Sequence, residues 1–249
     1  MHRAVDPGEE VVPPFCFAKT SAAFLAALTI LSAAGCSGGR GAANSVRAAG
    51  SPEGIAEKPL TVQNLKSLAL TAEEVPGNRG VEVREAASGS ESTFPPVSVT
   101  SCQTLVDFLR ADGASASVTQ VFNWEKDTSG GQSTLSYYGV DEAERAFQRV
   151  REALKKCGSY SGEGYAGEYT AHVAVSQAPE VGDEAVAFHE ATSVKSLDDA
   201  ESMTADSEYV CVRTGGAVVV FNKSGYGSDV KFPRQLIEKQ VDRLDEAQR

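Results

Sequence analysis

Apolar side chains recur every three or four residues in four segments of this chain, the spacing that one face of an α-helix produces. The clearest segment begins at Asp141 and stops before Gly158, and its apolar face consists of Ala143, Phe147, Val150, Leu154 and Cys157. The other three segments span residues 60–71, residues 101–109 (capped by Thr100 or Ser101) and residues 233–244. The pattern therefore predicts four helices.

Six further stretches alternate between apolar and polar residues or are rich in residues that favour strands. They are Val118–Glu125, Ser133–Tyr138, Tyr169–Ser176, Ala185–Val194, Tyr209–Arg213 and Ala217–Asn222. The composition of residues 127–131 predicts a turn between the first two, and Thr214-Gly-Gly216 predicts a tight hairpin between the last two. Residues 84–95 are polar and are expected to form a loop.

The predicted strands come in runs joined by short turns and do not alternate one for one with helices. This order favours an α+β fold: a mainly antiparallel, twisted sheet of about six strands with helices packed on one face. The length of the segment suits a single domain, which we place at residues 59–249.

The N-terminal part has a different character. Residues 20–35 form an apolar run of sixteen residues, shorter than the ~20 that a membrane-spanning helix needs and typical of the core of a signal peptide. The run ends in Ala33-Ala-Gly-Cys36, which resembles the lipobox of bacterial lipoproteins. We therefore expect residues 1–35 to be a signal peptide, Cys36 to carry diacylglycerol and residues 36–58 to be a flexible linker.

The extreme N-terminus fits a signal peptide less well, because a signal peptide begins with positive charge. Residues 1–18 contain three acidic residues and a single basic one, Arg3. A translation start at Val11 or Val12 would remove the acidic residues and leave Lys19 as the positive end.

Charge limits the classes of partner. The chain has 34 acidic and 23 basic residues, a net charge of −11, whereas proteins that bind nucleic acid or anionic lipid by charge cluster Lys and Arg. We expect no nucleic-acid partner. Membrane attachment must then come from the lipid on Cys36, and the two acyl chains of a diacylglycerol suffice for a stable anchor.

The chain has five cysteines. Cys16 would leave with the signal peptide and Cys36 would carry the lipid, so that Cys102, Cys157 and Cys211 remain. Cys102 and Cys157 each lie on the inner face of a predicted helix, and an exported protein can form disulfides. We expect a Cys102–Cys157 bridge with Cys211 free, although three ordinary buried thiols are the alternative.

Motifs for catalysis or metal binding are weak. Gly162-Glu-Gly-Tyr-Ala-Gly167 has the spacing of a dinucleotide-binding loop, but that loop follows a strand and opens a helix, whereas here a helix precedes and a strand follows. His172 and His189 are expected to be solvent-facing strand residues. The acidic segment of residues 198–208 is expected to be a solvated loop, and a weak calcium site is its alternative reading. We therefore predict no catalytic residues, no metal and no cofactor.

Aromatic residues offer the better candidates for a binding site, because ligand clefts are often lined by aromatic side chains with a few polar groups. Trp124, Tyr137 and Tyr138 fall on adjacent predicted strands, and Tyr165 lies in a glycine-rich segment with Tyr160 and Tyr169 nearby. We predict a ligand cleft that includes Trp124, Tyr137, Tyr138 and Tyr165. The alternative is that these residues simply build the sheet.

Taken together, these elements resemble the PknH-like extracellular domain family, the sensor-type domain of some actinobacterial receptor Ser/Thr kinases and of stand-alone actinobacterial lipoproteins. The resemblance covers residues 60–247. The matching segments are Leu70-Thr-Ala-Glu-Glu-Val-Pro-Gly77, the helix with Cys102, Val121-Phe-Asn-Trp124, the helix Asp141–Cys157, Val181-Gly-Asp-Glu184, and the closing hairpin and helix.

The resemblance implies a twisted antiparallel sheet with a ligand-binding cleft, and it implies no catalysis. Members of this family typically carry two disulfides, so one bridge is missing here and the partner of Cys211 is in doubt. We predict a lipid-anchored, extracytoplasmic ligand-binding or sensor-like lipoprotein of the cell membrane whose partner is an unknown small ligand. The alternative is an adaptor that binds another cell-envelope protein and no small molecule.

Overall fold

A computed structural model describes residues 58–86, 94–194, 203–227 and 230–249. The predicted signal peptide, the lipid site at Cys36 and the linker lie outside these residues, so those predictions remain untested.

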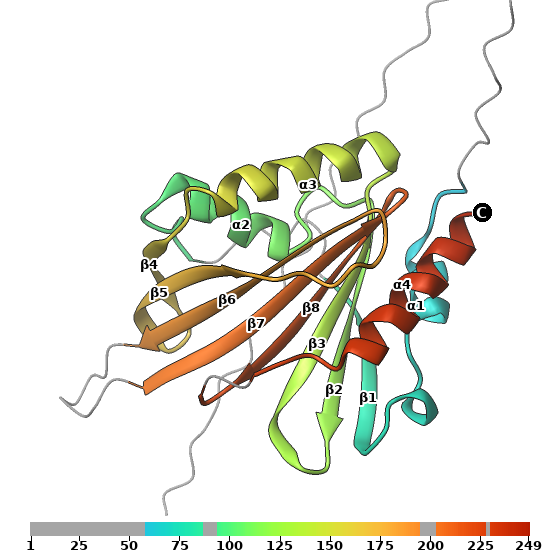
Figure 1. Cartoon of the computed structure of the whole chain (residues 1–249), viewed down its shortest axis with the longest axis horizontal. Coiled ribbons are helices and arrows are strands. Elements are labelled where there is room, and N and C mark those ends of the chain that lie inside the picture. Colours follow the sequence, from blue (N-terminus) through green and yellow to red (C-terminus); the bar gives the residue numbers. More distant parts are fainter. Residues whose placement is uncertain (1–57, 87–93, 195–202, 228–229) are drawn as a thin grey trace, which may run out of the picture. The chain divides into compact units, whose positions relative to one another are not determined.

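The described residues form four α-helices and eight strands (Figure 1). The helices are α1 (Val62–Leu68), α2 (Thr100–Leu109), α3 (Val140–Leu154) and α4 (Arg234–Gln248), and a short 3-10 helix, η1 (Ala72–Glu74), follows α1. The strands are β1 (Asn78–Glu85), β2 (Ala116–Trp124), β3 (Asp127–Tyr137), β4 (Ser159–Gly164), β5 (Gly167–Ser176), β6 (Glu184–Val194), β7 (Met203–Thr214) and β8 (Ala217–Gly225).

All eight strands belong to one sheet in the order β1-β2-β3-β8-β7-β6-β5-β4, and every neighbouring pair is antiparallel. The β7–β8 hairpin turns at Gly215-Gly216, as predicted. The other edge of β8 pairs with β3, where Leu135 lies opposite Val219. The predicted α+β fold with an antiparallel sheet is confirmed.

The helices cover both faces of the sheet, which corrects the prediction that they share one face (Figure 1). On one face, α1 and α4 pack on alternate strand residues such as Phe122, Val219 and Phe221. On the other face, α2 and α3 pack on the residues between them, such as Val218 and Val220. The central strands are therefore apolar on both sides, a pattern that does not identify which side a helix will cover.

The strand count is eight rather than six because β1 and β4, the two edge strands, were not predicted. Two further sequence assignments change. The segment of residues 127–131, predicted as a turn, is the start of β3, and the β2–β3 turn is formed by residues 125 and 126 instead. The glycine-rich segment Gly162–Gly167 is the β4–β5 hairpin.

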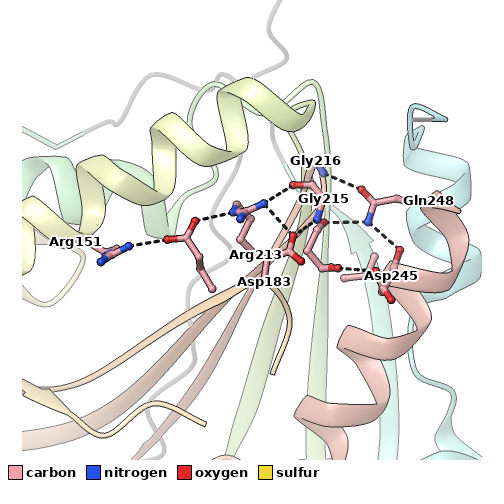
Figure 2. Close-up of polar contacts among 10 residues, drawn as sticks. Arg151, Asp183, Arg213, Gly215, Gly216, Asp245 and Gln248 are labelled. Carbon is pink, nitrogen blue, oxygen red and sulfur yellow. Dashed lines mark hydrogen bonds and ion pairs between the residues drawn. The ribbon is translucent and has the colours of Figure 1, made fainter. Parts of the chain in front are cut away.

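A cluster of charged groups joins the turn of the β7–β8 hairpin to neighbouring elements (Figure 2). Arg213 is buried, and its guanidinium donates to Asp183 and Glu184, each at 3.0 Å, and to the carbonyl of Gly215 at 3.3 Å. Glu184 also pairs with Arg151 of α3 at 2.8 Å. The guanidinium thus satisfies several acceptors at once, which a planar donor with five N–H groups can do.

The C-terminal end of α4 is attached to the same hairpin. The side chain of Gln248 accepts from the backbone N–H of Gly216 at 2.9 Å and donates to the carbonyl of Thr214 at 3.0 Å (Figure 2). Thr214 also donates to Asp245 at 3.2 Å. The Gln248 side chain thus satisfies two backbone groups of the turn, and it also donates to the Leu244 carbonyl near the end of its own helix at 2.9 Å.

Candidate ligand-binding cleft

A cleft of about 360 Å³ lies on the α2 side of the sheet. Its helical wall is the last turn of α2, with Val106, Leu109 and Arg110. Its strand residues are mostly polar and include Gln132, Thr134, Tyr160, Tyr169, Glu190 and Tyr209. The volume is at the small end of the roughly 300–1,000 Å³ typical of ligand pockets.

Glu190 of β6 is the most deeply buried charged group of the cleft, with 9% of its surface exposed. Its Oε2 accepts a hydrogen bond of 2.7 Å from the hydroxyl of Tyr160, and its Oε1 accepts one of 3.4 Å from Thr192. Burial raises the pKa of Glu190, because a charged carboxylate is poorly solvated there, while the two hydroxyl donors act in the opposite direction.

Three tyrosines surround this carboxyl. The rings of Tyr160 and Tyr169 meet edge to face, with their centroids 6.0 Å apart. Tyr209 stacks on Phe188 at 4.9 Å. Burial, with the charge of Glu190 as the next cause, raises the pKa of all three phenols, so they are neutral hydroxyl groups at physiological pH.

The position of Tyr169 explains a glycine of the hairpin. Gly162 lies directly opposite Tyr169 in the β4–β5 pair, and a Cβ at Gly162 would lie 2.6 Å from the tyrosine hydroxyl oxygen. The ring therefore lies across the glycine, an arrangement in which an aromatic side chain covers the exposed backbone of an edge strand. This packing accounts for Gly162, the first glycine of the formal dinucleotide-binding motif. Strand β5 follows the motif, so no helix N-terminus is in place to receive a phosphate.

Arg110 stands at the rim of the cleft, where α2 ends. It is exposed, and within the described residues its guanidinium forms no hydrogen bond or ion pair. The chain leaves the helix there through Ala111, which has a left-handed backbone (φ 61°). Arg110 lowers the pKa of Tyr169, whereas Glu190 raises it, so Tyr169 experiences both charges.

A second hollow of about 620 Å³ adjoins the first, and Tyr169 lines both. Its walls are the segment before α2, with Pro95 and Pro96, and the outer parts of β4, β5 and β6, with Glu163, Glu168 and Val194 among their residues. Tyr169 is the residue that the two hollows share, and Glu190 belongs to the first of them, the cleft beside α2.

Comparison with known proteins yields one kind of match. No family model and no curated protein matches the chain. Among solved structures, the chain is similar to the crystal structure of the extracellular domain of PknH from Mycobacterium tuberculosis, with a TM-score of 0.54 and 16% sequence identity over 76% of this chain and 97% of that one. This chain has the PknH extracellular-domain fold. The fold implied by the family resemblance is therefore confirmed.

Within this PknH-type fold, the four predicted cleft residues do not come together. Trp124 and Tyr137 pack on the opposite face of the sheet, where Trp124 stacks on Phe122 at 5.7 Å. Tyr138 lies on the α2 side, but it does not line the cleft. Tyr165 is 96% exposed at the β4–β5 turn. A role for these four in ligand binding remains a prediction.

The cleft residues that the prediction left out are Tyr160, Tyr169, Tyr209 and Glu190. Tyr160 and Tyr169 flank the glycine-rich segment, but the serines and glycines of β4 resemble a loop, so the local pattern does not predict the strand that contains Tyr160. With Ser159–Gly164 assigned as a strand opposite β5, residues 160 and 169 would have been placed on the covered face of the sheet. Nothing in the local sequence around Glu190 marks it as buried.

The predicted disulfide is present. Cys102 of α2 and Cys157, just after α3, are bonded, with their Cα atoms 4.9 Å apart. Cys211 is a free thiol buried in β7. Burial raises its pKa, so the group stays protonated, and a protonated thiol is a poor nucleophile. The bridge joins the two helices that pack on the cleft side of the sheet.

Other predicted features occupy structural positions. His172 and His189 lie diagonally across β5 and β6 on the face opposite the cleft, as their register shows. Among the described residues, no group of three or more His, Cys, Asp or Glu is placed to hold a metal ion. The same residues include no helix long and apolar enough to cross a membrane. Part of the acidic segment lies outside the description, and residues 203–208 belong to β7.

Proposed function

We propose that this protein is a lipid-anchored extracytoplasmic lipoprotein whose domain binds a small ligand, as a sensor does, and catalyses no reaction. The PknH extracellular domain, whose fold this chain shares, belongs to a receptor kinase and supports the location and the sensing role. The lipobox-like sequence ending at Cys36 supports the anchor.

One observation carries the ligand-binding part of the proposal: a buried carboxyl, Glu190, faces a cleft among three tyrosines. A buried polar group is costly unless it is paired, and a protein gains nothing in stability from keeping such a group beside an open cleft. Binding sites, in contrast, use a few convergent polar groups in a partly apolar hollow.

The cleft residues also argue against catalysis. The three phenols have raised pKa values and are poor nucleophiles, and Glu190 has no neighbouring histidine, lysine or cysteine among the residues that line the cleft. A nucleophile needs an adjacent base or a lowered pKa. The arrangement is suited to recognition.

Native mass spectrometry of the full-length protein, extracted in detergent from the cells that make it, tests the ligand-binding part. We expect a small molecule to remain bound to the wild type. Gln132→Trp places a large ring at the exposed wall of the cleft and should abolish the adduct. Gln235→Trp, on the exposed surface of α4, is the matched control and should retain it. A wild-type protein that carries nothing beyond its lipid under all growth conditions would contradict ligand binding.

A surface adaptor is the second candidate, and a specific observation favours it. Tyr165 is 96% exposed at the tip of the β4–β5 hairpin and stands edge-on to Phe94 with the ring centroids 4.8 Å apart. Exposed aromatic residues are frequent anchors at protein interfaces. Loss of a co-purifying envelope protein in Tyr165→Ser, with the small-molecule adduct unchanged, would support this role.

A further inference from the structure

The carboxyl of Glu190 has hydrogen-bond donors but no counterion. Within the described residues it forms no ion pair, and its donors are the neutral hydroxyls of Tyr160 and Thr192. A carboxylate has about four acceptor positions, of which these two donors use two. A cationic group entering the cleft would supply both the missing donors and the missing positive charge.

The surroundings of this carboxyl also suit a cation. Tyr160, Tyr169 and Tyr209 all lie close enough to Glu190 for its charge to act on their hydroxyl groups. Aromatic rings attract an ammonium group within about 6 Å through the negative charge of their faces. A carboxylate with several tyrosines is therefore a chemical match for an organic ammonium ion and a poor match for an anion.

The rim of the cleft has the opposite charge. Arg110 is exposed and forms no ion pair or side-chain hydrogen bond in the described part of the chain. Its planar guanidinium is suited to bidentate contact with a carboxylate or a phosphate. Both Arg110 and Glu190 line the same hollow of about 360 Å³, so one small molecule can reach both.

We propose that the cleft binds a zwitterion of the size of an amino acid or a short peptide, with its ammonium group at Glu190 and its carboxylate at Arg110. This inference rests on the proposed function, because it names the class of ligand that the same cleft binds.

The two charged ends decide between ligand classes. A neutral sugar could use the hydroxyl and amide groups of the cleft, but it would leave the buried charge of Glu190 unpaired. A simple cation would satisfy Glu190 and meet the positive charge of Arg110 at the entrance. A zwitterion complements both ends, and its net charge of zero adds nothing to the negative charge of the protein.

Saturation-transfer difference NMR on the full-length protein in detergent micelles provides the test, since it detects weak binding. The probes are alanine and the dipeptide alanyl-alanine as zwitterions, choline as a cation without an anion, and glucose as a neutral polyol. We expect alanyl-alanine or alanine to bind the wild type more tightly than choline and glucose do.

Two variants remove one charge each. Glu190→Gln keeps the shape and the acceptor for Tyr160, and Arg110→Gln keeps a polar side chain at the rim; each should weaken zwitterion binding at least tenfold, because a hydrogen bond to a charged group contributes about 1.5–3 kcal/mol. Glu168→Gln is the matched control. It removes the same charge from an exposed residue that does not line the cleft of about 360 Å³, and it should leave the affinity within about twofold.

Each outcome is decisive. Glucose bound equally by the wild type and Glu190→Gln would overturn the zwitterion and leave the sensor function in place. Choline bound as tightly as alanyl-alanine, with no effect of Arg110→Gln, would also overturn it. If no zwitterionic probe binds at millimolar concentration, the inference fails, whereas the ligand-binding function fails only if the native protein also carries no adduct.

Discussion

The hydroxyl of Tyr160 lies 2.7 Å from Oε2 of Glu190, although the two residues belong to β4 and β6, which are separated in the sheet by β5. Tyr160 can reach across because the residue opposite it on β5 is Ala171, whose side chain is a single methyl group. This hydrogen bond connects an edge strand to the interior of the cleft. It also keeps a buried carboxyl in place at the bottom of the candidate site.

Glu190 should make the folded protein less stable as pH rises. Its pKa is raised in the folded state, so between the ordinary glutamate pKa of about 4.3 and the folded-state value the folded protein binds more protons than the unfolded chain. The free energy of unfolding then falls with increasing pH across this window. Glu190→Gln should remove that fall and be the more stable protein at pH 7, because the folded wild type must either hold a poorly solvated charge or take up a proton there.

Urea unfolding at a series of pH values from 4 to 8 measures this effect. The exposed substitution Glu168→Gln is the control and should follow the wild-type profile. A constant difference between Glu190→Gln and the wild type at every pH would show that the carboxyl does not titrate in the expected direction.

Glu74 should show the opposite dependence. It accepts hydrogen bonds from Arg243 at 2.5 Å and Lys239 at 2.8 Å, and these donors hold its pKa far below the usual range. Its contribution is therefore complete above the ordinary glutamate pKa and is lost as pH falls toward the lowered folded-state value. Glu74→Gln should cost about 1–2 kcal/mol at pH 7, and the difference from wild type should shrink in acid.

The same urea series, extended to pH 2, checks this prediction. Glu152→Gln, which removes an exposed carboxylate paired with Lys155, should leave the urea midpoint close to that of the wild type, because solvent screens an exposed ion pair. An equal loss in both variants would mean that the contact between η1 and α4 contributes no more than a surface pair.

The Cys102–Cys157 bridge should be a major source of stability. It joins residues 55 positions apart, and in the chain-entropy model a loop of this size is worth roughly 4 kcal/mol. Cys102→Ala with Cys157→Ala should lower the free energy of unfolding by an amount of this order. Cys211→Ala, which removes the buried free thiol, should cost about 1 kcal/mol for a small buried group and leave the bridge intact in non-reduced peptide maps.

Removal of Arg213 should destabilise the β7–β8 hairpin. Arg213→Met keeps the length and the apolar stem, but it leaves Asp183, Glu184 and the carbonyl of Gly215 without this donor. Loss of one partner from a buried pair typically costs about 3–5 kcal/mol, and since both carboxylates reach solvent here we expect about 2 kcal/mol. Arg234→Met, which breaks an exposed pair with Glu238, should cost no more than about 0.5 kcal/mol.

The lipid anchor is tested by labelling. Wild-type protein should incorporate palmitate and partition into detergent, and Cys36→Ala should do neither, because the thioether to diacylglycerol needs the thiol. Cys16→Ala is the matched control and should be labelled as the wild type is. Equal labelling of Cys36→Ala would remove the anchor from the proposed function.

Much of the fold follows from local patterns. The helix from Val140 to Leu154 was predicted from its apolar spacing, and the β7–β8 hairpin from its two glycines. β1 also carries a local signal, since Val81 and Val83 alternate with polar residues. The predicted loop of residues 84–95 includes the end of this strand, and residues 78–83 have no predicted element. β4 is different: its glycines and serines resemble a loop, and only pairing with β5 makes it a strand.

The sequence by itself therefore determined the antiparallel α+β architecture and the Cys102–Cys157 pair, because helical spacing, strand alternation and the inner faces of two helices are local properties. Only the tertiary structure decided which helices cover which face, that Trp124 lies away from the cleft, and that Glu190 lies within it. These outcomes depend on strand order. The β7–β8 hairpin lies between β3 and β6 in the sheet, and no local pattern indicates that β8 will pair with β3 or β7 with β6. A glutamate in an alternating strand is normally exposed, and Glu190 is buried because Tyr160 and Tyr209 come to it from other strands.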